Sequence, residues 1–356
     1  MSSELRKYFE GNIQGDVIYA TTTTPARLGG LGNPKFQKMY IDAPLPEGEN
    51  IGRALLEIAV SSYQDPYGLR WKLWFDGFTV TRELKPHLVT NTRDQYFAKV
   101  VFDVTPIIKS QPKHTVSVFY EGGEPITIDH VGLLLVYPTD EVKSSISYLS
   151  GVGLLKPGEE IDVKVELEKI GGAGTFILTS IIPSPMAKLS IRLNEEDLGS
   201  LTGITGVEEY IKGDLNLLGI NKVTILHEKT STRYYPSEVK ISSLILYESI
   251  CKLPKIVLKE LSVAEDRKSV TLKICNEGAS EPNKILVLLI DRGNILGREI
   301  IKELAPGGET IVEMKLKKPI TSNEPILRIV WNKLSRMKII DKKLNLSTRT
   351  SSTNRT

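Results

Sequence analysis

Alternation of apolar and polar residues with a period of two runs through most of this chain of 356 residues. Segments rich in Val, Ile, Leu and Tyr, such as EIDVKVELEKI and KLSIRLN, recur from end to end, and Gly, Pro, Asn and Asp separate them. A period of two places apolar side chains on one face of a strand, whereas an amphipathic helix needs a period near 3.6. The sequence therefore predicts an all-β protein made of sandwiches, with few helices.

An internal pattern repeats across the first two thirds of the chain. A strand (KLWFDG or KLSIRLN) leads to a short irregular element (DVTPIIKS or IKGDLNLL), and two strands joined by a polar hairpin follow. The same order occurs in both copies, which favours duplication of one supersecondary unit. We therefore predict two tandem jelly-roll-like sandwiches of similar topology, at residues 12–139 and 147–249.

The pattern changes after Leu253. Strand-like segments then recur about every ten residues with Gly-containing turns, which is typical of an immunoglobulin-like sandwich. Pro254 stands where a linker or a first edge strand would begin. We predict this third domain at residues 254–345, and a disordered tail at 346–356 because LSTRTSSTNRT has almost nothing to bury.

Composition makes several classes of protein improbable. Hydrophobic residues make up 40% of the chain and charged residues 25%, which fits a globular protein. A net charge of +3 is too small to imply nucleic-acid binding, and no apolar run is long enough for a membrane-spanning helix. The start, MSSELRKYFEGNIQGDVIYA, lacks the apolar segment of a secretory signal, so we expect a chain that stays inside the cell or a mature form.

Two local features leave alternatives open. From Pro325 onward the chain has eight basic residues and one acidic residue, which indicates either a solvated tail or attraction to an acidic partner. Cys251 and Cys275 are too few for a disulfide framework, and the sequence leaves open whether they form a bridge.

Motifs for catalysis and metal binding are missing from the sequence. The four histidines, His87, His114, His130 and His227, do not have metal-ligand spacing. No GxSxG motif occurs, and RLGGLGNP lacks the GK[ST] of a phosphate loop. The two carboxylates of a glycosidase can lie far apart in sequence, and no such pair stands out. We therefore expect a protein that is not an enzyme and that has no cofactor and no metal site.

The stretch YGLRWKLWFDG at residues 67–77 contains two of the three tryptophans. Alternate residues of a strand here fall on two faces: Trp71, Leu73 and Phe75 on one, and Lys72, Trp74 and Asp76 on the other. The first face is apolar and should be core. The second face suits a partly exposed surface where an indole can lie against a sugar ring or another protein.

Two interpretations of Trp74 remain. In one, it forms part of an exposed binding surface; in the other, the preceding loop covers it and Tyr63 and Tyr67 close over it. On the first interpretation the candidate ligand-binding residues are Trp74, Tyr63, Tyr67 and Asp76.

These segments also carry a family resemblance. The runs GDVIYA, PEGENIGRALLEIAVSSY, WFDG, VVFDVTPIIKS and HTVSVFYEGGEPITIDHVGLLLVYP resemble a duplicated β-sandwich domain of unknown function from archaeal surface proteins, especially those of methanogens. VTLKICNEG, LAPGGE and TIVEMKL are similar to the CARDB module, a cell-adhesion-related immunoglobulin-like domain. Together the two resemblances cover nearly the whole chain.

The resemblance implies a non-catalytic structural, adhesion or assembly protein that uses sandwich surfaces to contact protein partners or other copies of itself. It also implies the cell surface or the extracellular space; because no secretory signal is visible, the cytoplasm stays open as well. Two other functions stay open: a carbohydrate-binding protein with an exposed aromatic platform, and a double jelly-roll capsid protein of an archaeal virus.

Overall fold

The computed structural model describes residues 4–43, 50–229, 238–334 and 336–346. The chain forms two compact units, Met1–Cys251 and Lys252–Thr356. The described residues form strands in several antiparallel sheets and one short 3-10 helix, which confirms the predicted all-β class. Within these ranges no helix has the length and apolar character needed to cross a membrane. The tail predicted to be disordered lies, from residue 347 onward, outside the described residues.

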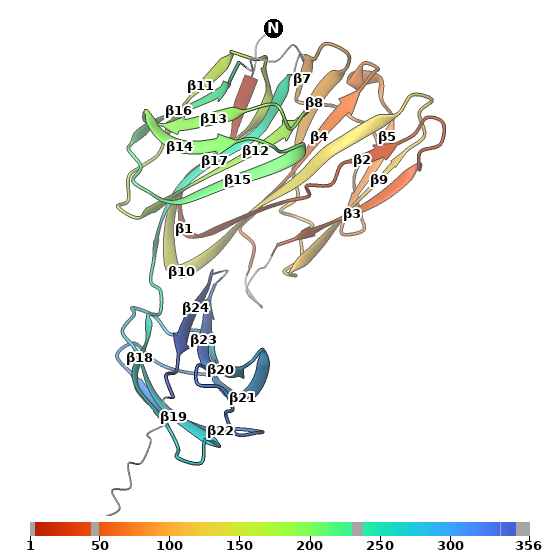
Figure 1. Cartoon of the computed structure of the whole chain (residues 1–356). Helices are drawn as coiled ribbons and strands as arrows, with labels where there is room; N and C mark the ends of the chain where they lie inside the picture. The colour runs from red at the N-terminus through yellow and green to blue at the C-terminus, as the bar shows by residue number, and fades with distance from the viewer. Residues whose placement is uncertain (1–3, 44–49, 230–237, 335, 347–356) are drawn as a thin grey trace, which may run out of the picture. The chain divides into compact units, whose positions relative to one another are not determined.

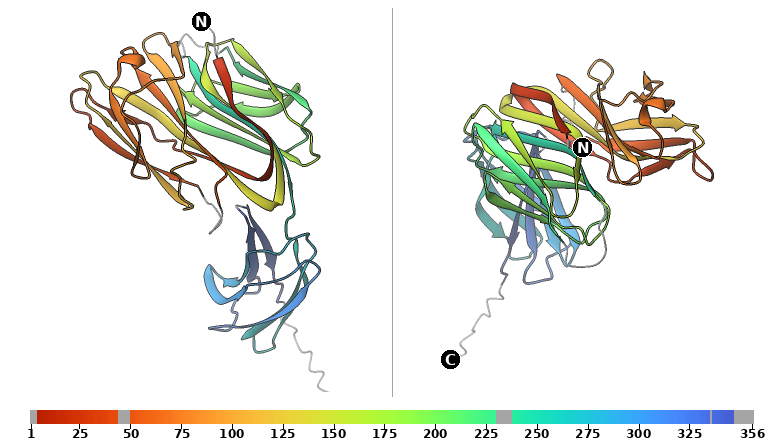
Figure 2. Two further views of the ribbon diagram at one scale, coloured as in Figure 1. Left: turned by 180° about the vertical axis from the view of Figure 1, so that it is seen from behind. Right: turned by 90° about the horizontal axis from the view of Figure 1, so that it is seen from above.

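The first unit contains two β-sandwiches that share one nine-stranded sheet (Figure 1). The strands of this shared sheet are β1 (Glu4–Thr21), β2 (Ala26–Leu28), β4 (Arg53–Ser62), β7 (Leu88–Asn91), β8 (Tyr96–Asp103), β10 (Ile126–Leu155), β12 (Ala173–Ile182), β15 (Gly206–Leu215) and β17 (Val239–Cys251). They run in the order β15-β12-β17-β10-β4-β8-β7, and β1 and β2 also pair with β10. Figure 2 shows the two sandwiches side by side, with the long strands crossing from one to the other.

Each sandwich is completed by a four-stranded outer sheet of its own. The first outer sheet contains, in spatial order, β3 (Phe36–Asp42), β9 (Lys113–Tyr120), β5 (Trp71–Phe75) and β6 (Phe78–Thr81). The second contains β11 (Glu160–Glu166), β16 (Ile220–His227), β13 (Leu189–Leu193) and β14 (Glu196–Leu201). The 3-10 helix η1 (Pro66–Gly68) lies in the loop before β5.

The two sandwiches have the same strand order. The outer sheets β3-β9-β5-β6 and β11-β16-β13-β14 match strand for strand, and so do the inner runs β2-β10-β4-β8 and β10-β17-β12-β15. Two four-stranded sheets connected in this way make an eight-stranded jelly roll. Strand β10 is therefore both the last strand of the first jelly roll and the first strand of the second.

One strand continues from the first jelly roll into the second. Residues 140–146, which lie between the first two predicted domains, fall inside β10. The chain stays extended there because β1 pairs with both halves of β10. The register shifts between Gln14 and Gly15, and the Gln14 amide donates to the carbonyls of Thr139 and Val142 at 3.1 and 3.0 Å. The sequence YPTDEV at residues 137–142 therefore marks an irregularity inside one strand.

The hydrophobic cores lie between the shared sheet and each outer sheet. The predicted core face of β5 is confirmed, because Trp71, Leu73 and Phe75 are all fully buried. The second jelly roll has an equivalent cluster that includes Phe176 of β12 and Leu244 of β17. Burial of each large apolar side chain contributes about 1.5 to 3 kcal/mol to the stability of the fold.

The second unit is a seven-stranded immunoglobulin-like sandwich. One sheet contains, in order, β18 (Ile256–Val263), β19 (Ser269–Asn276) and β22 (Glu309–Lys315); the other contains β21 (Asn294–Ile301), β20 (Lys284–Asp291), β23 (Ile326–Lys333) and β24 (Arg336–Lys343). Trp331 lies in the core between them, and its indole donates to the carbonyl of Pro254 at 3.4 Å. Cys275 carries a free thiol in β19, and Cys251 ends the last strand of the first unit.

Replacement of Gly15 tests the close approach of β1 and β10 between the jelly rolls. A Cβ atom at Gly15 would overlap the carbonyl oxygen of Tyr137, and this backbone atom cannot move without disturbing β10. We expect Gly15→Ala to destabilise the first unit by about 2 to 3 kcal/mol in urea unfolding. A Cβ atom added at Gly213 in β15 would point into open space, so Gly213→Ala should have little effect on stability. Equal effects of the two changes would contradict the close approach of β1 and β10.

Candidate ligand-binding cleft between the two jelly rolls

Glu57 lies at the centre of a polar cluster buried between the two halves of the shared sheet. Side chains alternate along β4, so Leu56 and Ile58 enter the first core whereas Glu57 points to the opposite face. Lys99 of the neighbouring strand β8 lies on the same face, and its Nζ is 3.0 Å from Glu57 Oε2. Both side chains are fully buried, so the pair is an ion pair shielded from water.

Hydroxyl groups from both jelly rolls surround this carboxylate. Four of them donate to Glu57: Tyr19, Tyr148 at 2.5 Å, Ser150 at 2.7 Å and Ser243 at 2.9 Å. Glu57 belongs to the first jelly roll. Tyr148 and Ser150 lie on the part of β10 that belongs to the second jelly roll, and Ser243 lies on β17 of the second jelly roll. The ionised carboxylate therefore has enough donors to replace its hydration, and it joins the two jelly rolls.

Lys99 makes further contacts with His130 and Ser242. Its Nζ donates to Ser242 Oγ at 2.5 Å and lies 3.2 Å from His130 Nε2, while the same hydroxyl is 2.6 Å from His130 Nε2. Burial and the positive charge of Lys99 lower the pKa of His130 to about 3. His130 is therefore neutral at physiological pH, and its Nε2 accepts hydrogen bonds.

The charges of this cluster are set by opposing effects. Burial by itself would raise the pKa of Glu57, but the charge of Lys99 and the hydroxyl donors outweigh it and lower that pKa to about 2. Burial lowers the pKa of Lys99 and raises the pKa values of Tyr19 and Tyr148 well above their usual range. Glu57 is therefore ionised at neutral pH, and both tyrosines keep the protons that they donate.

A second set of polar side chains extends from this cluster toward the surface. Ser61 Oγ donates to Asp129 Oδ2 at 2.6 Å and accepts from Lys240 Nζ at 2.7 Å. The Lys240 ammonium also lies 4.0 Å from Asp129 Oδ2 and 5.1 Å from the ring centroid of Phe97. Burial raises the pKa of Asp129 and lowers that of Lys240. Lys240 is thus held in place from the interior.

A cleft opens where Lys240 reaches the surface. It consists of two adjoining hollows of 830 and 570 Å³, which share Thr92, Arg93, Lys156 and Glu238. The first jelly roll contributes the hairpin between β7 and β8, and the second contributes the turn between β10 and β11 and the start of β17. The smaller hollow is also lined by Tyr63 and Lys240.

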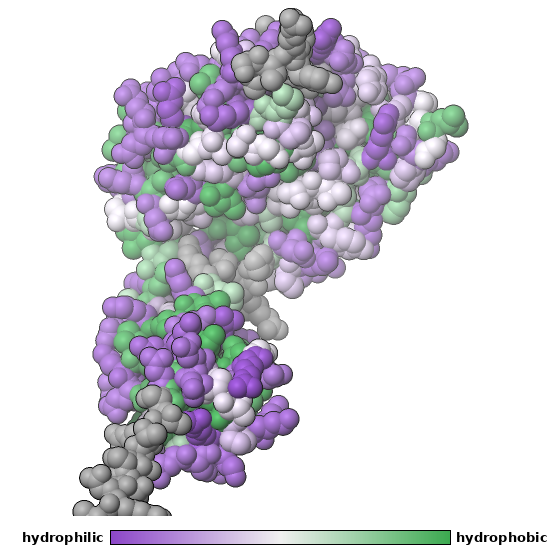
Figure 3. All heavy atoms as spheres, in the orientation of Figure 1, coloured by the Kyte–Doolittle hydropathy of each residue, from purple (hydrophilic) through white to green (hydrophobic). Residues whose placement is uncertain are grey.

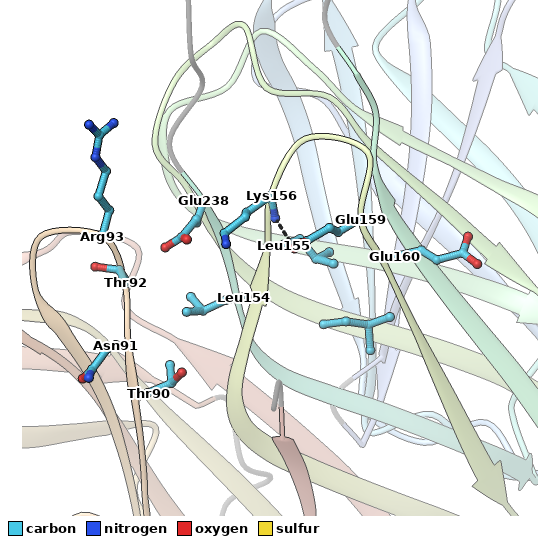
Figure 4. A pocket seen from close by; sticks show the side chains of 11 residues that line it. Thr90, Asn91, Thr92, Arg93, Leu154, Leu155, Lys156, Glu159, Glu160 and Glu238 are labelled. Atoms are coloured by element: carbon cyan, nitrogen blue, oxygen red, sulfur yellow. Dashed lines mark hydrogen bonds between the residues drawn. The ribbon is translucent and has the colours of Figure 1, made fainter. Parts of the chain in front are cut away.

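The side chains of Glu238 and Lys156 point from the second jelly roll toward the loop that carries Thr92 (Figure 4). Glu160 points the other way, and Glu159 accepts a hydrogen bond from the backbone N–H of Lys156 at 2.9 Å, so it stabilises the turn. The Oε2 atom of Glu238 is buried and has no hydrogen-bond partner among the described residues. An unpaired buried oxygen costs about 1 to 3 kcal/mol, so a ligand that donates a hydrogen bond here would be favoured.

The four candidate binding residues that the sequence predicts lie in different parts of the first jelly roll. Tyr63 lines the smaller hollow and is 57% exposed. Tyr67, in η1, is 61% exposed and is not among the residues that line the cleft. Trp74 is half-buried on the outer face of β5, where Ser117 of β9 lies opposite. A binding role for these residues stays a prediction, and only Tyr63 belongs to the cleft.

Asp76 does not share a face with Trp74, in contrast to the expectation. Strand β5 ends at Phe75, and Asp76 adopts a φ of 48° in the turn that follows. Its carboxylate lies 2.7 Å from His114 Nδ1 and accepts from the backbone N–H of Thr115 at 2.8 Å. These contacts make Asp76 part of the structure of the hairpin.

The four histidines of the sequence lie in separate places. His114, His130 and His227 are fully buried in β9, β10 and β16, and His87 lies 3.1 Å from the hydroxyl of Tyr8. Within the ranges that the structure describes, no group of three or more His, Cys, Asp or Glu side chains is arranged to hold a metal ion.

No family model and no curated protein match this sequence. Solved structures with some likeness include peptide:N-glycanase F (PNGase F; TM-score 0.28, 11% identity, 65% of this chain and 95% of that chain) and an FMN-binding β-glucuronidase from Facaelibacterium prausnitzii L2-6 (0.22, 10%, 57% and 32%). A third is the ligand-binding region of the serine-glutamate repeat protein SgrA of Enterococcus faecium (0.20, 13%, 26% and 90%). The chain thus spans 32% of the length of the glucuronidase.

These comparisons correct one expectation. From the sequence we expect a protein that is not an enzyme, whereas the glucuronidase and N-glycanase F are enzymes. At these TM-scores the likeness carries neither activity over to this chain. The resemblance to archaeal surface domains and to the CARDB module stays a prediction, because no comparison bears on it.

Removal of the charge on Glu57 tests the role of the buried cluster. Glu57→Gln leaves the Lys99 ammonium buried without its counter-ion, so we expect a loss of about 3 to 5 kcal/mol in the free energy of unfolding. The measurement is urea unfolding followed by the fluorescence of the two tryptophans of the first unit, in a Trp331→Phe background. The double variant Glu57→Gln, Lys99→Met should recover part of the loss. Exposed Glu121 serves as the control, since Glu121→Gln should cost less than about 0.5 kcal/mol; equal losses would contradict the proposed role of Glu57.

Proposed function

We propose that this protein binds a carbohydrate in the cleft between its two jelly rolls. Ligand sites occur preferentially where two compact bodies meet, because the two surfaces together supply a concave wall. Here the walls come from the β7–β8 hairpin of one jelly roll and from the β10–β11 turn and the start of β17 of the other. The buried cluster that joins the jelly rolls supports a cleft of fixed shape.

The lining supports a ligand with many hydroxyl groups. Both signs of charge occur in the smaller hollow, together with neutral polar groups: Arg93, Lys156, Lys240, Asp94, Glu238, Thr92 and Gln95. Such a set offers donors and acceptors in similar numbers, which matches the hydroxyls of a sugar. A strongly anionic ligand would instead favour a lining of one positive sign.

The observation that carries the proposal is the unpaired Oε2 atom of Glu238 in the same hollow as Tyr63. A sugar hydroxyl can donate to this oxygen while the apolar face of the sugar ring lies against the aromatic ring of Tyr63. The sequence suggests an aromatic platform at Trp74, and the geometry of the cleft favours Tyr63 in its place. We propose that this carbohydrate binding serves the adhesion or assembly role that the resemblance implies.

A glycan array followed by calorimetry tests the proposal. The full chain should bind at least one class of glycan, and Tyr63→Ala and Glu238→Gln should each weaken the binding at least about tenfold, which corresponds to about 1.4 kcal/mol. Tyr67→Ala is the matched control, because Tyr67 has similar exposure nearby in the chain and lies outside the cleft. Binding that all three variants weaken equally, or a wild-type chain that binds no glycan, would refute the proposal.

A further inference from the structure

The four-stranded sheet of the second unit has an outer face that is unusually apolar. Successive side chains of β20 alternate, so Ile285, Val287 and Leu289 enter the core and their neighbours point outward. Nine aliphatic or thioether side chains point outward from the four strands: Leu286, Leu288, Ile290, Ile295, Ile300, Ile326, Val330, Met337 and Ile339. We call this surface the aliphatic face.

Strand register aligns these side chains in rows across the sheet. One row contains Ile300, Leu286, Val330 and Ile339, each directly opposite the next across β21, β20, β23 and β24. A second row contains Ile295, Ile290 and Ile326. The row between them contains Arg298, Leu288, Arg328 and Asp341. Apolar side chains therefore extend over the full width of the sheet.

The aliphatic face is accessible within this unit. Ile295, Ile300, Met337 and Ile339 are between 48% and 64% exposed, and the residues of β20 and β23 on this face are partly exposed. The second unit shows apolar surface among its charged side chains in Figure 3. The other sheet contrasts with it, because Ile311 shares the outer face of β22 with the charged side chains of Glu309, Glu313 and Lys315.

The sequence of β20 gives an independent argument. The segment KILVLLID is apolar at six successive positions, so both faces of the strand are apolar. Strands of this kind are typical of sheets that are covered on both sides, whereas a sheet with one solvated face shows alternation. The outer face of β20 therefore has the composition of a buried surface.

We propose that the aliphatic face is the self-association surface of this protein and that a second copy of the chain packs against it, sheet to sheet. A two-fold axis parallel to the strands, between β20 and β23, would place β21 of each copy over β24 of the other. The row of Ile300 and Ile339 then packs against the same row of the second copy.

Charge complementarity supports a second copy of the chain as the partner of the aliphatic face. Asp341 on β24 holds Arg328 in a bidentate ion pair, with both N–O distances at 2.7 Å. Arg298 lies in the same row on β21, at the other edge of the sheet. The two-fold arrangement places Arg298 of one copy opposite Asp341 of the other, so each carboxylate meets a second guanidinium.

The area is also sufficient. The nine side chains expose roughly 600 Å² in each copy, so mutual burial would remove roughly 1,200 Å² in total, which is the lower end of the range for specific interfaces. Homodimer interfaces are also richer in apolar area than the rest of a protein surface.

Sedimentation of the full chain from about 1 to 100 µM tests this proposal, because an interface of this size commonly dissociates in the micromolar range. We expect a dimer in the wild type and a monomer in the double variant Ile300→Lys, Ile339→Lys. Ile311→Lys is the control: it adds the same charge at an exposed isoleucine of the other sheet and should leave the dimer intact.

Circular dichroism establishes that each variant is folded. Arg298→Glu is a milder change at an exposed position, and it should weaken the dimer at least about tenfold because it brings two carboxylates together. A wild-type chain that stays monomeric over the whole range, or a dimer that Ile311→Lys dissociates to the same extent, would overturn the proposal. A dimer that Arg298→Glu leaves unchanged would overturn the two-fold arrangement.

Discussion

The first unit depends on one buried ion pair, between Glu57 and Lys99. Transfer of two charges out of water is costly, and removal of either partner leaves the other charge uncompensated. The cost is offset here because donors from both jelly rolls replace the hydration of the carboxylate, among them Tyr148 and Ser243 of the second jelly roll. Separation of the two jelly rolls would expose a carboxylate that has lost these donors. The ion pair therefore constrains how the two jelly rolls pack, in addition to the continuous strand β10 that links them.

The packing of the two jelly rolls also positions the residues that line the cleft. Lys240 lines the cleft and is held by Ser61 and Asp129, which lie beside the residues of the buried cluster on β4 and β10. Tyr63 follows β4 in the first jelly roll and Glu238 precedes β17 in the second, so their approach depends on the packing of the two jelly rolls. A preorganised site of this kind loses little conformational entropy when it binds a ligand.

The all-β class and the core faces could be predicted from the sequence, because alternation with a period of two indicates strands and places their apolar side chains on one face. The continuity of β10 through Pro138 could not be predicted, because it depends on pairing with β1, more than a hundred residues away. The buried cluster was also missed. Its signals are single charged or polar residues in apolar strands, such as Glu57 in ALLEIAV and Lys99 in AKVV, and their hydroxyl partners come from three other strands, β1, β10 and β17. Of the predicted binding residues only Tyr63 reaches the cleft, because a period-two pattern places residues on faces but not in loops.

The pH dependence of unfolding tests the buried cluster most directly. His130 has a pKa of about 3 in the folded chain, and an unfolded histidine has an ordinary value near 6.5. Between these values the unfolded chain binds a proton that the folded chain does not, so stability falls as the pH falls below about 6.5. The account predicts that the wild type in the Trp331→Phe background loses about 2 kcal/mol more between pH 7 and pH 5 than the same chain with His130→Gln, measured by urea unfolding. Equal losses in the two chains would contradict it, because His130 would then not be neutral and shielded from water beside Lys99.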